Sequence, residues 1–209
     1  MLIFLTAARL FARRGYIGTS MNQVAEAAGL SKASLYHYYR DKYALLVSIA
    51  DGHVSRLAAF VEDEQALALA GEERLRHFIN RIVEEYSGAQ DAHRVLTEDV
   101  RFLEPDDRER ILNKERQVVA AFSRAVTEMR PELASAHLAK PLTMLLFGMV
   151  NWMFTWIKPD GELNHAAMGP IVADLFLGGI GNVQPPAATP AKTKPRKTRA
   201  KPPALAASH

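Results

Sequence analysis

Apolar positions recur at spacings of three and four residues along almost the whole chain up to about residue 180. This period is that of a helix with one buried face, and the strict alternation that indicates strands is scarce. A first apolar stripe of Ile3, Ala7 and Phe11 ends at Gly15, and Ser20 to Gln23 has the form of a capping box that begins a second helix. The pattern predicts an all-α protein.

Further helices follow from the same pattern and from capping residues. Ser31 begins a third helix that runs through Tyr39, and Asp41 caps a fourth. Later helices are expected at about 72–88, 91–103, 106–129, 132–157 and 165–178, with Pro141 kinking or restarting the helix over 132–157. From Val183 onward proline, alanine and lysine dominate without any aromatic residue, so residues 183–209 are expected to form a disordered basic tail.

The segment from Met21 to Leu35 follows the steric pattern of a helix-turn-helix. Val24 is expected to be buried, Ala25 is small enough for a close helix crossing, and Gly29 supplies the turn. Leu30 and Leu35 then fill the wedge between the two helices. An ordinary helical hairpin is the alternative, but it has no need of this glycine or of two capping serines.

The wider segment resembles the DNA-binding domain of TetR-family transcriptional regulators. The resemblance is carried by ARLFARRGYIGTSMNQVAEAAGLSKASLYHYYRDKYALL within residues 3–50. It implies a three-helix DNA-binding domain at 1–50 and a helical ligand-binding and dimerisation domain at 51–182. It also implies a homodimer that binds a double-stranded DNA operator as a repressor and is released by a small-molecule effector.

The resemblance places part of the third helix at the DNA. The residues it implies there are Lys32, Ala33, Ser34, Tyr36, His37 and Tyr38. Lys32 can donate to a guanine edge, Ala33 can touch a thymine methyl, and Ser34 can serve either base type. Phosphate oxygens suit Tyr36, His37, Tyr38, Ser20 and Lys42 better. The alternatives are that Tyr38 wedges between helices and that His37 and Lys42 are plain surface residues.

Charge is distributed unevenly along the chain. Residues 1–50 carry six Lys/Arg against two acids, residues 51–182 carry 14 against 21, and residues 183–209 carry six basic groups and no acid. Only the two ends would be attracted to a polyanion such as DNA. A structural, weakly specific nucleoid-type DNA-binding protein that uses the basic tail is therefore the alternative to a repressor.

The composition gives no sign of an enzyme. There is no cysteine, and the seven histidines show no pair at metal-ligand spacing, so no catalytic residue, metal or cofactor is expected. No signal peptide or membrane span is expected either, which favours a soluble protein of the cytoplasm, associated with the nucleoid.

The segment 148–180 contains Asn151-Trp152, Trp156, a Lys-Pro turn and Asp174-Leu175-Phe176. With these residues it is similar to the C-terminal part of TetR-type regulators of fatty-acid, sterol or aromatic-acid degradation, which respond to acyl-CoA thioesters. Its two helices are expected to form a four-helix dimer interface, unless they only close the core of one subunit. Candidate residues for a hydrophobic effector pocket are Phe78, Ile82, Tyr86, Leu96, Phe122, Met144, Phe147 and Trp152. For the phosphates of an acyl-CoA, Arg94, Arg101 and Arg116 are candidate partners.

Overall fold

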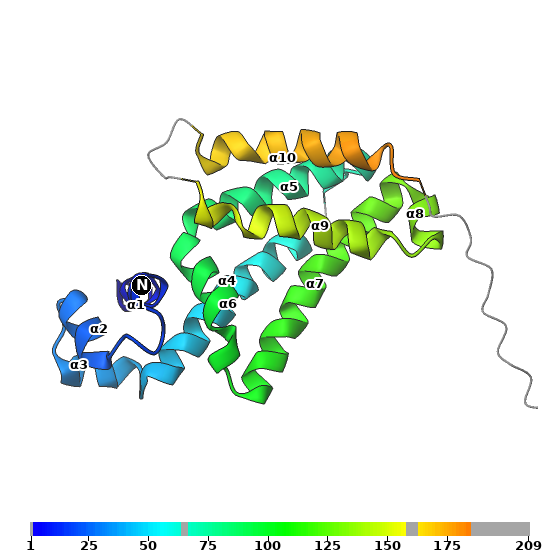
Figure 1. The fold of residues 1–209 in the computed structure, drawn as a ribbon. Coiled ribbons are helices and arrows are strands. Elements are labelled where there is room, and N and C mark those ends of the chain that lie inside the picture. The colour runs from blue at the N-terminus through cyan, green and yellow to red at the C-terminus, as the bar shows by residue number, and fades with distance from the viewer. Residues whose placement is uncertain (1, 64–66, 158–162, 185–209) are drawn as a thin grey trace, which may run out of the picture.

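The chain folds into packed helices, as the hydrophobic period predicts. The computed structural model describes residues 2–63, 67–157 and 163–184. Within these ranges the regular structure is helical throughout (Figure 1). The all-α prediction is therefore confirmed.

The first three helices form a small unit at one end of the molecule (Figure 1). They are α1 (Leu2–Arg14), α2 (Met21–Ala27) and α3 (Lys32–Tyr38). The predicted capping box at Ser20 and Gln23 is present, and Ser31 caps α3. Gly29 has a φ of +66° in the turn between α2 and α3, a left-handed conformation that costs glycine little and strains other residues.

Helix α4 (Lys42–Asp63) leads out of this unit into the rest of the molecule. Its start is capped by Asp41, whose Oδ1 accepts a hydrogen bond of 2.7 Å from the Ala44 backbone N–H. By length and mean hydropathy α4 could cross a membrane, but 56% of its apolar window is buried inside the protein. It passes through the predicted domain boundary at 50/51 without a break, so both parts of the molecule share this helix.

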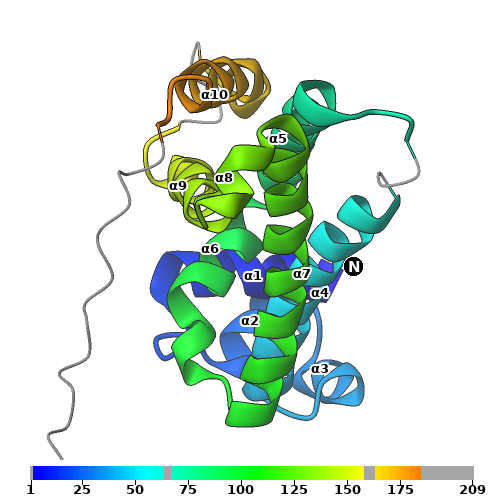
Figure 2. The ribbon, with the colours of Figure 1, turned by 90° about the vertical axis from the view of Figure 1, so that its right-hand side faces the viewer.

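The second part is a layered bundle of longer helices. These are α5 (Gly71–Gly88), α6 (Gln90–Asp99), α7 (Pro105–Met129), α9 (Ala139–Asn151) and α10 (His165–Ile180), with the short α8 (Pro131–Ser135). Short 3-10 turns, η2 (Val100–Phe102) and η3 (Met153–Thr155), follow α6 and α9. Helix α10 packs along α5, and α7 packs against both α4 and α9 (Figures 1 and 2).

The single helix expected over 132–157 is wrong. Helix α8 ends at Ser135, His137 takes a φ of +57°, and a new helix begins at Ala139. Pro141 is the third residue of α9, where its missing N–H has no partner within the helix to lose. Of the two outcomes expected for Pro141, the restart is the one observed.

Two predicted features lie outside the described residues. The turn expected at Lys158 to Gly161 belongs to the range 158–162, and most of the expected basic tail belongs to the range 185–209.

The helix-turn-helix unit does not have a core of its own. Its buried residues, among them Phe11, Val24 and Leu35, share one cluster with Leu96 of α6 and Ile111 of α7. A second cluster, which contains Phe60, Phe78, Phe122 and Phe147, fills the larger bundle. Because α4 and α7 contribute buried residues to both clusters, a change in the bundle can reach the first unit through direct packing.

Candidate DNA-binding surface and ligand cavity

Helix α3 has one anchored side and one open side. Leu35 is fully buried, and Tyr39, the residue that ends α3, is half-buried against the same core with its hydroxyl 3.4 Å from Ser48 Oγ. The other side exposes Lys32, Ala33, Tyr36, His37 and Tyr38, with Tyr36 at 42% and Tyr38 at 66% exposure. The Lys32 Nζ lies 5.8 Å from the centroid of the Tyr36 ring, one helical turn away. This outer side is available to a groove of DNA.

The serines assigned to DNA also hold the helix ends. Ser20 Oγ accepts a hydrogen bond from the Gln23 backbone N–H at 3.3 Å, and Ser31 Oγ accepts one from the Ser34 N–H at 3.0 Å. The Ser34 hydroxyl lies 2.8 Å from Ser31 Oγ and is half-buried. Ser20 is exposed and can still meet a phosphate, whereas Ser34 would have to exchange its partner to reach a base.

Lys42 is half-buried beside the loop that precedes α2. Its Nζ donates hydrogen bonds to the backbone carbonyls of Tyr16 at 2.8 Å and Ile17 at 3.4 Å, and it lies 4.4 Å from the centroid of the Tyr16 ring. The structure thus gives this lysine a role in bracing the loop, in addition to the phosphate contact expected from the sequence.

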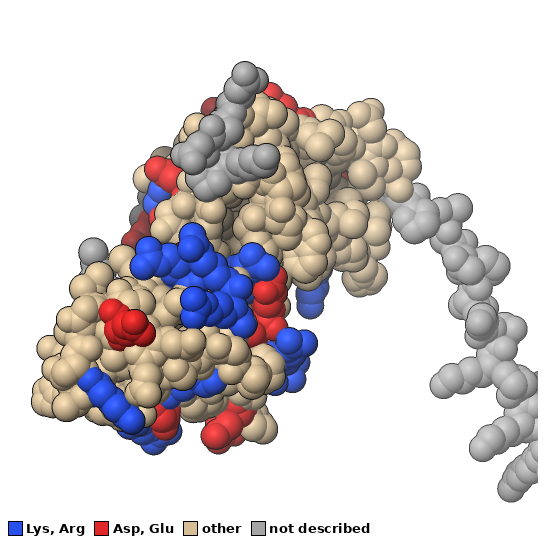
Figure 3. All heavy atoms as spheres, turned by 60° about the vertical axis from the view of Figure 1, so that its left-hand side comes forward, with Lys and Arg blue, Asp and Glu red and all other residues tan. Residues whose placement is uncertain are grey.

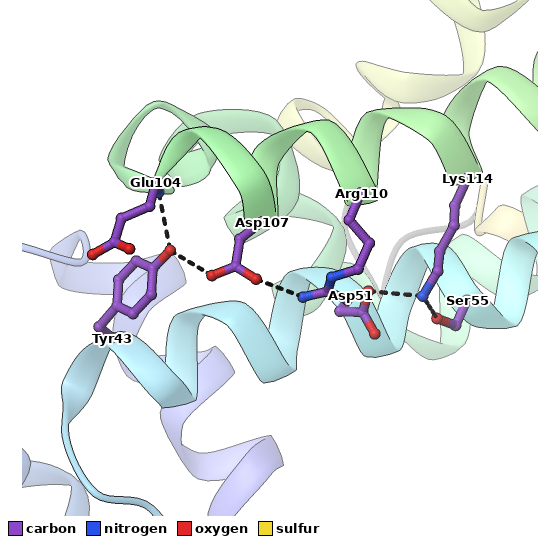
Figure 4. Close-up of polar contacts among 7 residues, drawn as sticks. All are labelled: Tyr43, Asp51, Ser55, Glu104, Asp107, Arg110 and Lys114. Carbon is purple, nitrogen blue, oxygen red and sulfur yellow. Dashed lines mark hydrogen bonds and ion pairs between the residues drawn. The ribbon is translucent and has the colours of Figure 1, made fainter.

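A polar ladder joins α4 to α7 (Figure 4). The Tyr43 hydroxyl donates to Asp107 at 2.7 Å and accepts from the Glu104 backbone N–H at 2.9 Å. Arg110 binds both Asp107 and Asp51, and Lys114 donates to Asp51 and to Ser55, each at 2.7 Å. The bonds to Arg110 and Tyr43 lower the pKa of Asp107. The ladder follows α4 from its first turn, next to α3, towards the centre of the bundle.

An inner cavity of about 140 Å³ lies beyond this ladder, between α4, α5, α6, α7 and α9. Its apolar lining is Val54, Leu57, Leu96, Val118, Val119, Met144 and Phe147. Its polar lining is Tyr86, His93, Thr97, Glu115 and Asn151. Since Val54 and Leu57 belong to α4, the helix that starts beside α3 also forms a wall of this cavity.

The predicted pocket residues divide between this cavity and other places. Tyr86, Leu96, Met144 and Phe147 line it. Phe78, Ile82 and Phe122 are buried in the packed core and are not among its lining residues, and Trp152 is 57% exposed on the surface. The hydrophobic period predicts that such aromatic and aliphatic residues are buried. It does not show which of them line a cavity and which are packed on all sides.

An outer groove of about 560 Å³ adjoins the inner cavity. It is lined by Leu112, Glu115, Arg116, Val119, Ala120, Ser123, Arg124, Lys140 and Met144. Glu115, Val119 and Met144 line both spaces and mark the neck between them. Burial raises the pKa of Glu115, and the nearby Arg116 only partly opposes this. The inner cavity has a mostly apolar lining, whereas the outer groove is lined by the basic residues Arg116, Arg124 and Lys140.

Two buried histidines lie at the polar end of the inner cavity. His93 Nε2 is 3.1 Å from the Asn151 carbonyl oxygen, which can only accept, so Nε2 carries the proton. His93 Nδ1 then accepts from His53 Nε2 at 3.2 Å, and His53 Nδ1 faces Arg56 at 3.5 Å. Burial lowers the pKa of His53 to about 3 and that of His93 to about 4. Both rings are therefore neutral near pH 7.

The histidine pair could not be predicted from the sequence, where no two histidines lie at metal-ligand spacing. His53 and His93 are 40 residues apart, and only the packing of α4 on α6 brings them together. Within the described part of the chain, no group of three or more His, Cys, Asp or Glu residues could hold a metal ion. The pair is thus a neutral hydrogen-bonded element, of which His93 lines the cavity and His53 lies behind it.

Basic side chains gather on one face where the first unit meets the bundle (Figure 3). Helices α1 and α6 pack against each other, and they carry the exposed residues Arg9, Arg13 and Arg94, followed by Arg101 in η2. Arg94 pairs with Glu98 at 3.0 Å and Arg101 stacks on Phe102. Arg94 and Arg101 line neither the inner cavity nor the outer groove. Of the three arginines expected to bind phosphates, only Arg116 lines the groove.

The last helices present an apolar outer face. Leu145 of α9 and Trp152, which directly follows α9, are 65% and 57% exposed, and Ile171 and Leu175 of α10 are 46% and 64% exposed. A salt bridge between Arg76 of α5 and Asp174 of α10 joins these two helices. Apart from Leu145, the face lies in the segment 148–180, where the sequence predicts the dimer interface.

The groove residues Arg124 and Lys140 are functional candidates that the sequence reading missed. A signal was present, because Leu112, Arg116, Ala120 and Arg124 recur every fourth residue and therefore share one side of α7. What that side faces depends on α9, which a sequence pattern does not place.

Comparisons with known proteins match both parts of the chain. Residues 3–49 match the family described as "Bacterial regulatory proteins, tetR family", and residues 68–180 match "Tetracyclin repressor-like, C-terminal domain".

Three similar proteins cover nearly the whole chain. The HTH-type transcriptional repressor KstR2 of Mycobacterium tuberculosis is 26% identical over 83% of this chain and 88% of its own length. The crystal structure of a TetR-family regulator from Bordetella parapertussis has a TM-score of 0.80 at 33% identity and covers 87% of this chain and 95% of its own. The structure of AibR in complex with isovaleryl coenzyme A and operator DNA has a TM-score of 0.68 at 28% identity, covering 88% and 97%.

Proposed function

Because the chain belongs to the TetR family of DNA-binding transcriptional regulators, we propose that it is a repressor that binds an inverted-repeat operator as a homodimer. A small hydrophobic ligand, specifically an acyl-CoA, releases it from the DNA. The proposal assigns residues 1–50 to DNA binding and residues 51–182 to ligand binding and dimerisation.

The outer side of α3 carries the DNA-binding part of the proposal. A helix that only completes a core has no reason to expose Lys32, Tyr36, His37 and Tyr38 together while Leu35 holds its other side. Lys32 and Ala33 reach base edges in this assignment, and Tyr36, His37, Tyr38, Ser20 and Lys42 contact phosphates. Small Ala33 lets the backbone approach the major groove closely.

The exposed apolar face of α9 and α10 supports the homodimer. A two-fold axis that pairs this face with its copy makes a four-helix interface and covers Leu175 and Ile171. A dimer places two copies of α3 about 34 Å apart, one turn of the DNA duplex, so the operator is expected to be an inverted repeat.

The cavity and groove support the ligand-binding part. The structure of AibR contains both isovaleryl coenzyme A and operator DNA, and its fold matches this chain over most of both lengths. In the present chain α4 lines the inner cavity with Val54 and Leu57 and begins directly after α3. A ligand that shifts α7 against α4 would thereby also shift α3 relative to the DNA.

The experiment is a selection of binding sequences from a random pool of duplex DNA with the purified full chain. Enrichment of an inverted repeat is the expected result, and Lys32→Ala should relax the preference at one base position in each half-site. Enrichment of no sequence, together with loss of binding when residues 183–209 are removed, would instead support the weakly specific alternative that relies on the basic tail.

A further inference from the structure

We propose that the inner cavity selects a short, neutral acyl group of about six non-hydrogen atoms, joined to an anionic head that stays in the outer groove. This inference rests on the proposed function and specifies the ligand class: a short-chain acyl-CoA rather than a long-chain acyl-CoA or a free acid.

The volume of the inner cavity sets the size of the group. An apolar protein cavity of about 150 Å³ accommodates benzene, which has six carbons. The inner cavity has about 140 Å³ and a largely apolar wall that includes Leu57, Leu96 and Phe147, all almost fully buried. A branched or straight acyl chain of about five or six carbons fills this space, whereas a palmitoyl chain or a steroid skeleton exceeds it.

The charge of the lining excludes a free carboxylate from the interior. No lysine or arginine lines the inner cavity among the described residues, and the nearest ionisable group at the neck is the acid Glu115. The polar end is already bonded internally, since Tyr86 donates to Asn151 at 2.9 Å and Thr97 donates to the His93 carbonyl at 2.9 Å. A buried anion without a cationic partner is unfavourable, so the end that enters is neutral.

The outer groove provides the opposite environment. Arg116, Arg124 and Lys140 line it, and neither Arg124 nor Lys140 has an acidic partner among the described residues. These groups suit the phosphates of coenzyme A. The pantetheine arm would pass the neck at Glu115, Val119 and Met144, which line both spaces.

The test is isothermal titration calorimetry of the full chain with acetyl-, isovaleryl-, hexanoyl-, decanoyl- and palmitoyl-CoA and with free hexanoate. Isovaleryl- or hexanoyl-CoA should bind most tightly, palmitoyl-CoA at least about tenfold more weakly, and hexanoate not measurably. Tighter binding of palmitoyl-CoA, or equal binding of hexanoate, would overturn the inference while leaving a ligand-released repressor intact. Binding of no acyl-CoA would overturn the inference and the acyl-CoA assignment, whereas specific DNA binding is measured separately without ligand.

Variants of the wall separate size selection from general effects. Leu57→Ala removes three carbons from the cavity wall and should move the preferred chain length upward by about that number, whereas Leu133→Ala, buried outside both spaces, should leave the preference unchanged. Met144→Ala changes a half-exposed residue of the neck, and it is the second test of size selection if Leu57→Ala does not fold. An unchanged preference in both Leu57→Ala and Met144→Ala contradicts the assignment.

Variants of the groove test the position of the head. Combined Arg124→Ala and Lys140→Ala should weaken all the acyl-CoAs by a similar factor, on the order of tenfold, without changing the preferred chain length. Arg108→Ala removes an exposed arginine of the same helix that does not line the groove and is the matched control. Equal effects of the double variant and the control would place the head elsewhere and overturn this part.

Discussion

The Tyr43 hydroxyl donates a hydrogen bond of 2.7 Å to Asp107, 64 residues further along the chain, and so joins the first turn of α4 to the first turn of α7 (Figure 4). Tyr43 lies a few residues after α3, and α7 carries Glu115 and Val119, which line both the inner cavity and the outer groove. This contact is the end of the ladder nearest to the DNA-binding surface. In the proposed mechanism, the Tyr43 hydroxyl and the Asp107 carboxylate transmit a movement of α7 to the start of α4.

Tyr43→Phe should lower the free energy of unfolding by about 1–2 kcal/mol, because it removes the hydrogen bonds that the Tyr43 hydroxyl makes with Asp107 and with the Glu104 N–H. Urea denaturation measures this difference. Tyr38→Phe is the matched control, since the Tyr38 side chain is 66% exposed, and its stability should equal that of the wild type. An equal loss in both variants would show that Tyr43 contributes nothing specific.

The buried histidine pair predicts a loss of stability in mild acid. His53 and His93 have pKa values of about 3 and about 4 in the folded protein, below the usual value of 6.5, mainly because they are buried. The unfolded chain therefore binds more protons below pH 6.5, and the free energy of unfolding falls as the pH drops from about 6.5 towards 4. The slope approaches about 1.4 kcal/mol per pH unit for each histidine.

Urea denaturation at a series of pH values measures that slope. His93→Gln should lower it, whereas His37→Gln, which changes an exposed histidine on α3, should not. The same slope in the wild type and His93→Gln would argue that other groups cause the acid sensitivity.

Leu175→Glu should convert the dimer into monomers, because it places a charge on the exposed face of α10 where the copy is proposed to pack. Size-exclusion chromatography with light scattering gives the mass. Leu67→Glu is the control, since Leu67 is also exposed, at 41%, but precedes α5. A monomeric wild type, or a variant that stays dimeric, would contradict the assigned interface.

Lys32→Ala and Lys42→Ala should affect DNA binding in different ways. Loss of a base contact at Lys32 should cost about 1–3 kcal/mol at one base position, whereas loss of Lys42 should weaken all sequences alike and reduce the salt slope by about one. Fluorescence anisotropy at several salt concentrations separates the two effects. If Lys42→Ala is less stable but has the same salt slope as the wild type, then Lys42 only holds the loop through its bonds to Tyr16 and Ile17 and does not contact a phosphate.

The sequence predicted the parts of the fold that depend on neighbouring residues. Ser20, Ser31 and Asp41 cap helices as expected, and Gly29 forms the turn, because each acts on backbone groups within a few residues. The restart of the helix within 132–157 was expected from Pro141, but the position of the break at His137 was not, since an apolar run of helical period does not show where one helix ends and the next begins.

The lining of the inner cavity was predictable only in part. Tyr86 and Phe147 line the inner cavity, but Phe78 and Phe122, of equal apolar character, pack against each other with ring centroids 5.2 Å apart. Whether an aromatic residue lines a space or fills it depends on how five helices meet. The contact between His53 and His93 and the contact between Tyr43 and Asp107 likewise arise from helix packing across long separations in sequence.

The most direct test of a ligand-released repressor is fluorescence anisotropy of the selected inverted repeat bound to the full chain, titrated with hexanoyl-CoA. We expect the anisotropy to fall to that of free DNA over the concentration range in which calorimetry shows hexanoyl-CoA to bind. DNA that stays bound when the protein is saturated with hexanoyl-CoA would contradict this expectation.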